Sequence, residues 1–194
     1  MKRVFDIVVS ATLLVVLGPI VVATAVVVTL TLGRPIFFRQ ERAGLGGKPF
    51  HLIKFRTMTN ARGADGKLLP DGERLTRTGS FLRSTSIDEL PELLNVLRGH
   101  MSLVGPRPLH VAYLPRYSAH HARRHAVRPG ITGLAQVNGR NATTWTERLD
   151  MDVFYVDNRT MWLDLRMLAR TFGAVFSRRG IAAPGEATMP EFRG

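Results

Sequence analysis

The feature that most constrains the fold is a long apolar stretch near the N-terminus. Residues 4–32 are apolar apart from Asp6 and scattered serines and threonines. As a single helix, about 29 residues at roughly 1.5 Å each would exceed the roughly 30 Å hydrocarbon core of a bilayer. A cleavable signal peptide fits poorly, because the run is too long and no small-residue cleavage site precedes a polar mature start. The stretch therefore predicts a membrane-embedded segment.

Gly18 and Pro19 stand almost at the centre of this stretch. A proline inside a helix removes a backbone hydrogen bond and bends the helix, which leaves two arms of about 20 Å that are too short to cross alone. Positive residues flank the stretch on both sides: Lys2 and Arg3 before it, and Arg34, Arg39 and Arg42 after it. Because positive flanks stay in the cytoplasm, we predict a re-entrant helix-break-helix over residues 1–33. A spanning helix kinked at the proline is the alternative.

Adjacent carboxylates, Asp88 and Glu89, precede an apolar helical pattern that runs from Leu90 to Leu97. Ser86 and Glu89 have the spacing of a capping box, so the acids could serve only to start the helix. An aspartate at the positive end of a helix dipole is, however, kept ionised, which is the state that a carboxylate nucleophile needs. The pair is therefore a catalytic candidate.

Three long motifs occur in order: KFRTM from Lys54, SIDELPELLNVLRGHMSLVGPRP from Ser86, and RPGITGLAQVNGRN from Arg128. Together with the apolar N-terminal hairpin they resemble the bacterial sugar transferase family, the small monotopic phosphoglycosyl transferases. The resemblance covers nearly the whole chain. It implies a re-entrant hairpin in the bacterial inner membrane and a catalytic domain on the cytoplasmic face.

The resemblance also implies a reaction. A UDP-sugar gives its phosphosugar to membrane polyprenol (undecaprenyl) phosphate and releases UMP, as the first membrane step of bacterial glycan assembly. Asp88 would form an aspartyl-phosphosugar intermediate, and Glu89 would act as a general base or as a positioning group, a choice that the sequence leaves open. Both carboxylates would hold Mg²⁺.

Asp88 and Glu89 are called the dyad below. Cations that stand at intervals on both sides of the dyad in the sequence are the expected phosphate ligands. Lys54 and Arg56 are two residues apart on a predicted strand and so share one face, where they could be solvated charges on an edge strand. Their place in the motif KFRTM of the family implies instead that Lys54 contacts the acidic site or a substrate phosphate. Arg107 stands between prolines in a stiff turn, and its guanidinium suits bidentate phosphate contact. The resemblance adds Arg83 near the phosphates and places the nucleotide end at Arg128 and Arg140. The expected substrate-binding residues are Lys54, Arg56, Arg83, Arg107, Arg128 and Arg140.

The predicted fold is mostly α with a small β-hairpin. Residues 35–58 read as two short strands joined by a turn at residues 44–47, residues 60–79 as a surface loop, and residues 75–86 as a short helix or turn. An amphipathic interfacial helix is expected over residues 147–178. We divide the chain into a membrane hairpin (1–33), a catalytic domain (34–180) and an extended tail (181–194).

The formal net charge of +12 implies an anionic partner. An anionic phospholipid membrane is the expected surface, and the basic region from Pro115 to Arg128 reads as a helix lying on headgroups. A nucleic-acid binder is the rival class, but no nucleic-acid motif occurs, so we expect no nucleic acid partner. Zinc at His120, His121 and His125 is not expected, because adjacent histidines point apart on a helix and no carboxylate accompanies them. The oligomeric state stays open, a homodimer included.

Overall fold

The computed structural model describes residues 1–138, 143–177, 191–192 and 194. The chain begins with two helices, α1 (Lys2–Val16) and α2 (Gly18–Leu32), which are bent by 62° at the break between them. Pro19 lies in the first turn of α2, where its missing N–H costs nothing. The predicted break is thus confirmed. No described helix is by itself long and apolar enough to cross a membrane, whereas α1 and α2 meet that length and composition as a bent pair.

Two strands form the predicted hairpin. β1 (Phe37–Ala43) pairs antiparallel with β2 (Pro49–Phe55), from Phe37 opposite Phe55 to Ala43 opposite Pro49. A second pair was not predicted: β3 (Ser102–Val104) runs parallel to β4 (Gly130–Thr132). At Gly130 a Cβ would lie 2.1 Å from the backbone nitrogen of Gly105. Only glycine therefore fits this approach of two chain segments.

Short helical elements fill the middle of the chain. They are α3 (Asp71–Arg74), α4 (Arg77–Ser84), η2 (Ile87–Glu89), α5 (Glu92–Leu97), η3 (Val111–Arg116), α6 (Ala119–Ala122), η4 (Arg123–Ala126) and α7 (Leu134–Asn138). The predicted basic helix over residues 115–128 is wrong, because this region is three short pieces. Arg124 is buried in it and donates to the carboxylate of Asp152 at 2.7 Å, so this cation faces the protein interior.

The predicted amphipathic helix over residues 147–178 is two helices, α8 (Trp145–Asn158) and α9 (Met161–Ser177). Arg159 leaves helical geometry with ψ of 124°. The Thr160 hydroxyl then accepts from the Leu163 amide at 3.1 Å, as an N-cap residue does. Thr160 was a usable N-cap signal in the sequence, but the apolar helical period continues on both sides of it, so one helix was predicted.

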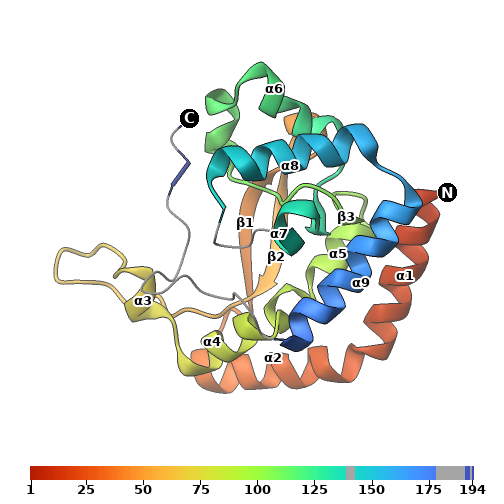
Figure 1. Ribbon diagram of the computed structural model, residues 1–194. Coiled ribbons are helices and arrows are strands. Elements are labelled where there is room, and N and C mark those ends of the chain that lie inside the picture. The colour runs from red at the N-terminus through yellow and green to blue at the C-terminus, as the bar shows by residue number, and fades with distance from the viewer. Residues whose placement is uncertain (139–142, 178–190, 193) are drawn as a thin grey trace.

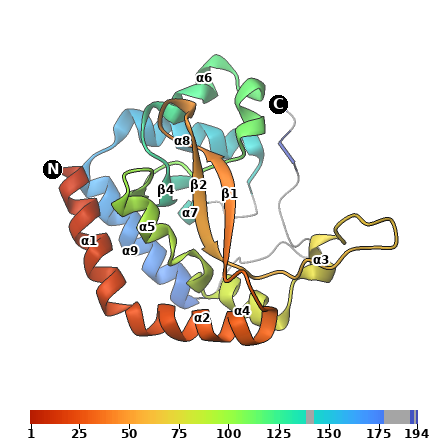
Figure 2. The same ribbon diagram turned by 180° about the vertical axis from the view of Figure 1, so that it is seen from behind.

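The N-terminal helices form two outer sides of the molecule, and each packs on the rest of the chain (Figures 1 and 2). Phe5, Val9 and Leu13 of α1 pack on the main core, whose buried members include Leu93, Leu103, Tyr155 and Met167. Val28 of α2 packs with Phe55 and Leu82 in another core. Asp6 of α1 is buried; its carboxylate accepts from the Ser102 hydroxyl at 2.8 Å and lies 3.9 Å from the Lys2 ammonium.

The opposite face of both helices stays uncovered. Its exposed apolar residues are Val4, Ile7, Val8, Val15, Val16, Ile20, Val22, Val26, Val27 and Leu30. In the predicted tail (181–194), residues 181–190 and 193 lie outside the described residues, as do residues 178–180 before it. Phe192 is buried, and its ring lies 5.6 Å from that of Tyr113 and 5.4 Å from those of Tyr117 and Trp145.

Candidate active site

The acidic pair lies between α4 and α5 on the 3₁₀ turn η2, not at the first turn of the α-helix as predicted. Ser86 opens this turn in the left-handed conformation, with φ of 56°, and its side chain makes no capping hydrogen bond. The capping-box interpretation is therefore wrong. Asp88 is buried, and the Glu89 carboxylate faces the cations of neighbouring segments.

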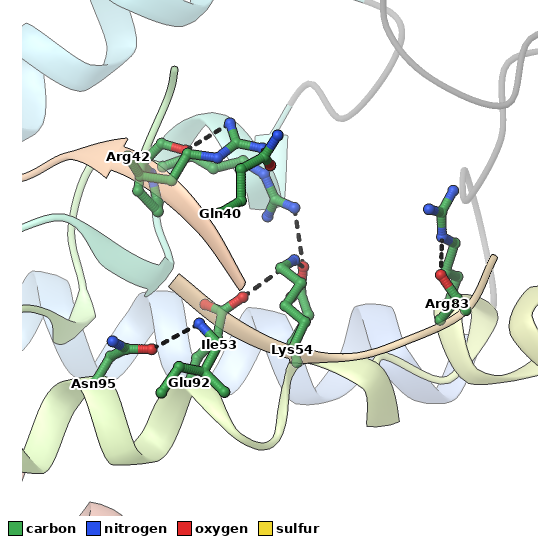
Figure 3. A network of polar contacts seen from close by, with 11 residues as sticks. Gln40, Arg42, Ile53, Lys54, Arg83, Glu92 and Asn95 are labelled. Carbon is green, nitrogen blue, oxygen red and sulfur yellow. Dashed lines mark hydrogen bonds and ion pairs between the residues drawn. The ribbon is translucent and has the colours of Figure 1, made fainter. Parts of the chain in front are cut away.

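Lys54 connects two carboxylates. Its ammonium lies 2.5 Å from Oε1 of Glu89 and 3.1 Å from Oε1 of Glu92, and the Arg107 guanidinium lies 2.9 Å from the same Glu89 oxygen. Figure 3 shows Lys54 reaching from β2 toward Glu92 on α5. The fixed turn VGPRP directs Arg107 to this cluster, as predicted from its prolines.

Asn95 fixes the position of Lys54. Its side-chain oxygen accepts from the Ile53 amide at 3.1 Å, and its nitrogen donates to the His51 carbonyl at 2.8 Å. Asn95 is fully buried, so β2 and α5 are held in one register (Figure 3). Lys54 on β2 is thereby held in a fixed position relative to the dyad, which precedes α5.

Burial and charge separate the pKa values of the three acids. Burial, with the charge of Glu89, raises the pKa of Asp88 to about 6. Burial would also raise that of Glu89, but Lys54 and Arg107 lower its pKa to about 2. Burial raises the pKa of Glu92 to about 7 in spite of Lys54. The predicted effect of a helix dipole on Asp88 is not what sets its pKa, because the residue lies on η2 ahead of a helix of only six residues, and burial raises its pKa.

The other predicted cations separate into groups. Arg83 donates to the Thr57 hydroxyl at 3.1 Å and lowers the pKa of Asp88 by its charge, so it belongs to the site. Arg56 follows the last residue of β2, and its buried guanidinium donates to carbonyls at the end of α2, including that of Gly33 at 2.6 Å. Its described contacts are therefore with the end of α2 and the residues that follow it, and not with the dyad.

Arg128 also lies elsewhere. Its Nε donates to the Gly99 carbonyl at 2.8 Å, at the far end of α5, where Arg128 lines a separate cavity. Arg140 lies outside the described residues. Gly18 and Pro19 form the helix break and take no part in the dyad.

Sequence reasoning missed Glu92 and Asn95. Glu92 stands three residues after Glu89, and residues so spaced face the same side of a helical segment. This spacing was a usable signal. Asn95 had none, because its function depends on a strand 42 residues earlier in the chain.

The dyad fits a magnesium ion that is bound together with phosphates. Both cations on Glu89 use Oε1, and no hydrogen-bond donor contacts the Asp88 carboxylate among the residues described. Carboxylate oxygens suit Mg²⁺, which is usually held by one or two of them with substrate phosphates and water. Asp88 and Glu89 are the residues that would hold it.

The sequence argument against a metal site at the histidines rested partly on the lack of a carboxylate, and the structure places one beside two of them. Asp150 of α8 lies 3.5 Å from His120 and 3.0 Å from His121, measured from its Oδ1 to each Nε2. The three residues could hold a metal ion. The structure thus supplies the carboxylate whose absence from the sequence motif counted against a metal.

Taken together, the site has a buried acid that accepts no described hydrogen bond, a second acid fixed by two cations, and a further arginine nearby, an arrangement that is chemically suited to phosphates. The family model described as bacterial sugar transferase matches residues 1–178. The chain belongs to this family of membrane-associated sugar transferases, and it is an enzyme of the phosphoglycosyl transferase class.

Individual relatives agree. The chain is 52% identical to EpsL of Bacillus subtilis, an uncharacterized sugar transferase, over 100% of this chain and 96% of that one. It is 45% identical to a UDP-glucose:undecaprenyl-phosphate glucose-1-phosphate transferase of Caulobacter vibrioides, over 88% of this chain and 67% of the relative. It is 38% identical to an undecaprenyl-phosphate galactose phosphotransferase of Salmonella typhimurium, over 93% of this chain but only 41% of the relative.

Proposed function

We propose that this protein transfers a phosphosugar from a UDP-sugar to undecaprenyl phosphate, giving undecaprenyl diphosphate sugar and UMP, as an early membrane step of bacterial glycan assembly. The names of the Caulobacter and Salmonella relatives support this donor and acceptor. The observation that carries the proposal is the asymmetry of the dyad. Glu89 is fixed by Lys54 and Arg107, whereas the Asp88 carboxylate beside it accepts no hydrogen bond from the described residues.

In the first step an oxygen of Asp88 attacks the sugar-bearing phosphorus. The bond from this phosphorus to the bridging oxygen breaks, and UMP leaves with that oxygen. With a pKa of about 6, Asp88 is mostly ionised at neutral pH and ready to attack. Lys54, Arg83 and Arg107 offset the charge of the phosphates, which is the main requirement of phosphoryl transfer.

In the second step an oxygen of undecaprenyl phosphate attacks the phosphorus of the aspartyl-phosphosugar. The bond to Asp88 breaks, and the free carboxylate is regenerated. The depressed pKa of Glu89 supports a positioning role for this residue, because a carboxylate with a pKa of about 2 is a weak base. Mg²⁺, when bound by Asp88 and Glu89, supplies further charge neutralisation.

The proposal extends to membrane attachment. The bent pair α1 and α2 has one face packed on the catalytic part and one exposed apolar face. An apolar face of this kind is suited to the acyl region of a single leaflet, with the catalytic part on the cytoplasmic side, where the positive flanks favour it.

Intermediate trapping tests this function. Enzyme with Mg²⁺ and one of a panel of UDP-sugars, without undecaprenyl phosphate, should release one UMP per enzyme and gain the mass of one phosphosugar. Asp88→Asn should abolish both, and Glu89→Gln should slow turnover. A panel with glucose, galactose and N-acetylated sugars identifies the donor. An adduct on Glu89, or UMP release only when both substrates are present, would contradict the two-step mechanism.

A further inference from the structure

A cavity of about 360 Å³ lies away from the dyad, beside the start of α1. Arg3, which lines it, donates to the carbonyls of Val96 and Leu97 at 2.7 and 3.0 Å, at the end of α5. The dyad precedes α5, and six helical residues rise about 9 Å. The cavity and the dyad therefore lie at opposite ends of this helix.

The cavity carries more positive than negative charge. Four cations line it, and its two carboxylates are satisfied within the protein: Asp6 accepts from Ser102, and Asp164 accepts from the Tyr155 hydroxyl at 2.7 Å and pairs with Lys2. The cations are Lys2, Arg3, Arg128 and Arg159.

Two of these cations keep guanidinium nitrogens available. Arg128 uses only its Nε, on Gly99, and Arg159 is exposed and pairs with no other described residue. Paired guanidinium groups match the oxygens of a phosphate, which they bind with two parallel hydrogen bonds. An anionic ligand with phosphate geometry therefore suits the cavity.

Two exposed apolar residues are sequence neighbours of residues that line the cavity. Val4, next to Arg3 on α1, is 64% exposed, and Trp162, next to Met161 on α9, is 69% exposed. Figures 1 and 2 both show α1 and α9 side by side near the N-terminus. Exposed tryptophan at the start of an apolar face is typical of the headgroup level of a membrane. Tyr155, the one aromatic ring among the described residues of the lining, is 1% exposed and offers no face for stacking a nucleobase.

We propose that this cavity binds the phosphate of an anionic glycerophospholipid, with the acyl chains lying along the exposed face of α1. Arg128 and Arg159 hold the phosphate, and Val4 and Trp162 contact the beginning of the chains. Arg128 then binds lipid and not the nucleotide end of the donor, which is the role that the family resemblance implied. Binding of this lipid needs no catalytic turnover, so its test is independent of the proposed function.

The test measures lipid retention by native mass spectrometry on the full chain in detergent, titrated with phosphatidylglycerol or phosphatidylcholine. Phosphatidylglycerol should bind in a one-to-one complex and phosphatidylcholine should bind more weakly. Arg128→Ala and Arg159→Ala should each lower phosphatidylglycerol affinity about fivefold, the usual contribution of one cation near an anionic headgroup. Lys67→Ala is the charge-matched control, because the Lys67 side chain is 85% exposed in a distant loop, and it should change nothing.

Three results would overturn the proposal. The double variant Arg128→Ala/Arg159→Ala could retain phosphatidylglycerol like the parent, or both lipids could bind equally to the parent. Alternatively, UMP could displace the lipid while the two variants raise the KM for UDP-sugar, which would identify a nucleotide site. Circular dichroism of each variant verifies folding, and Arg159 has no described contact whose loss would unfold the chain.

Discussion

Lys54 is the residue on which the charges of the site depend. Its ammonium neutralises Glu89 and Glu92 together, and the latter side chain is only 3% exposed. Removing one partner of a buried pair leaves an uncompensated charge and costs about 3 to 5 kcal/mol. Lys54→Met should therefore lose on the order of 3 kcal/mol of unfolding free energy in urea titration, together with most of its UMP release.

Glu92→Gln changes the other partner of the Lys54–Glu92 pair and is the control for Lys54→Met. Because the pKa of Glu92 is about 7, this side chain already carries a proton in about half of the molecules at neutral pH. Glutamine imitates that form, so we expect less than a tenfold loss of activity. Combined with Lys54→Met it should recover part of the lost stability. A Lys54→Met protein as stable as the parent would show that the pairing contributes nothing.

His125 makes stability depend on pH. Burial and the neighbouring Arg124 lower its pKa to about 4, whereas in the unfolded chain it is about 6.5. As pH falls below 6.5 the unfolded state takes up the proton first, so this residue costs stability between pH 6.5 and 4. From pH 7 to 5 the loss is on the order of 1 to 2 kcal/mol.

The variant His125→Phe removes this titration and keeps a ring of similar size. Its unfolding free energy should fall less than that of the parent between pH 7 and 5. The difference between the two proteins isolates His125, since the raised pKa values of Asp88 and Glu92 act in the opposite direction in both. Equal pH profiles would contradict the depressed pKa.

At this scale the sequence predicted Asp88, Glu89, Lys54, Arg83 and Arg107 as one group, and the structure brings them together. Arg107 was predictable from its stiff proline turn, whereas Lys54 and Arg83 were placed in the group by the family resemblance. Arg56 was misplaced in this group for a physical reason: β2 ends at Phe55, and the alternation of a strand no longer directs the next side chain.

Among the elements, α4 depends on one glycine. A Cβ at Gly79 would lie 1.8 Å from the Thr57 carbonyl oxygen, which is backbone and has little freedom to move. Gly79→Ala should therefore separate α4 from the segment after β2 and displace Arg83, with a loss of several kcal/mol and of activity. Thermal unfolding and UMP release measure both effects.

Gly173→Ala is the control for this substitution. Gly173 lies in α9 with nothing within 4 Å of its added Cβ. Alanine is favoured over glycine in a helix by up to about 1 kcal/mol, so this variant should be as stable as the parent or more stable. If both variants behaved alike, the close approach at Gly79 would be refuted.

Elements with a strong local signal were predictable. The break at Pro19, the β1–β2 hairpin and α4 all follow from proline, from turn glycines and from apolar periodicity. The parallel pair β3–β4 was not, because three-residue strands carry no period and their pairing joins segments about 28 residues apart. The buried Arg124 was read as a surface charge, since its partner Asp152 is equally distant in sequence.

For the whole molecule, the central prediction concerns topology. A chain without cysteine allows clean single-cysteine labelling. A cysteine added ahead of Lys2 and the variant Arg34→Cys should react from the same, cytoplasmic side of sealed vesicles, because the bend divides the pair into arms too short to span. Pro19→Ala should transfer part of the population to opposite sidedness. If the two single-cysteine proteins with Pro19 intact were labelled from opposite sides, a spanning helix would be established.

The contacts of the first turn also have a consequence for timing during synthesis. Lys2 pairs with Asp164, 162 residues later, and Asp6 accepts from Ser102, 96 residues later. At about 5 to 20 residues per second, the partner of Lys2 leaves the ribosome roughly 10 to 30 s after Lys2 itself. The pair α1 and α2 is therefore synthesised first and docks last. Until it docks, the Asp6 carboxylate can interact only with the neighbouring Lys2 and with water.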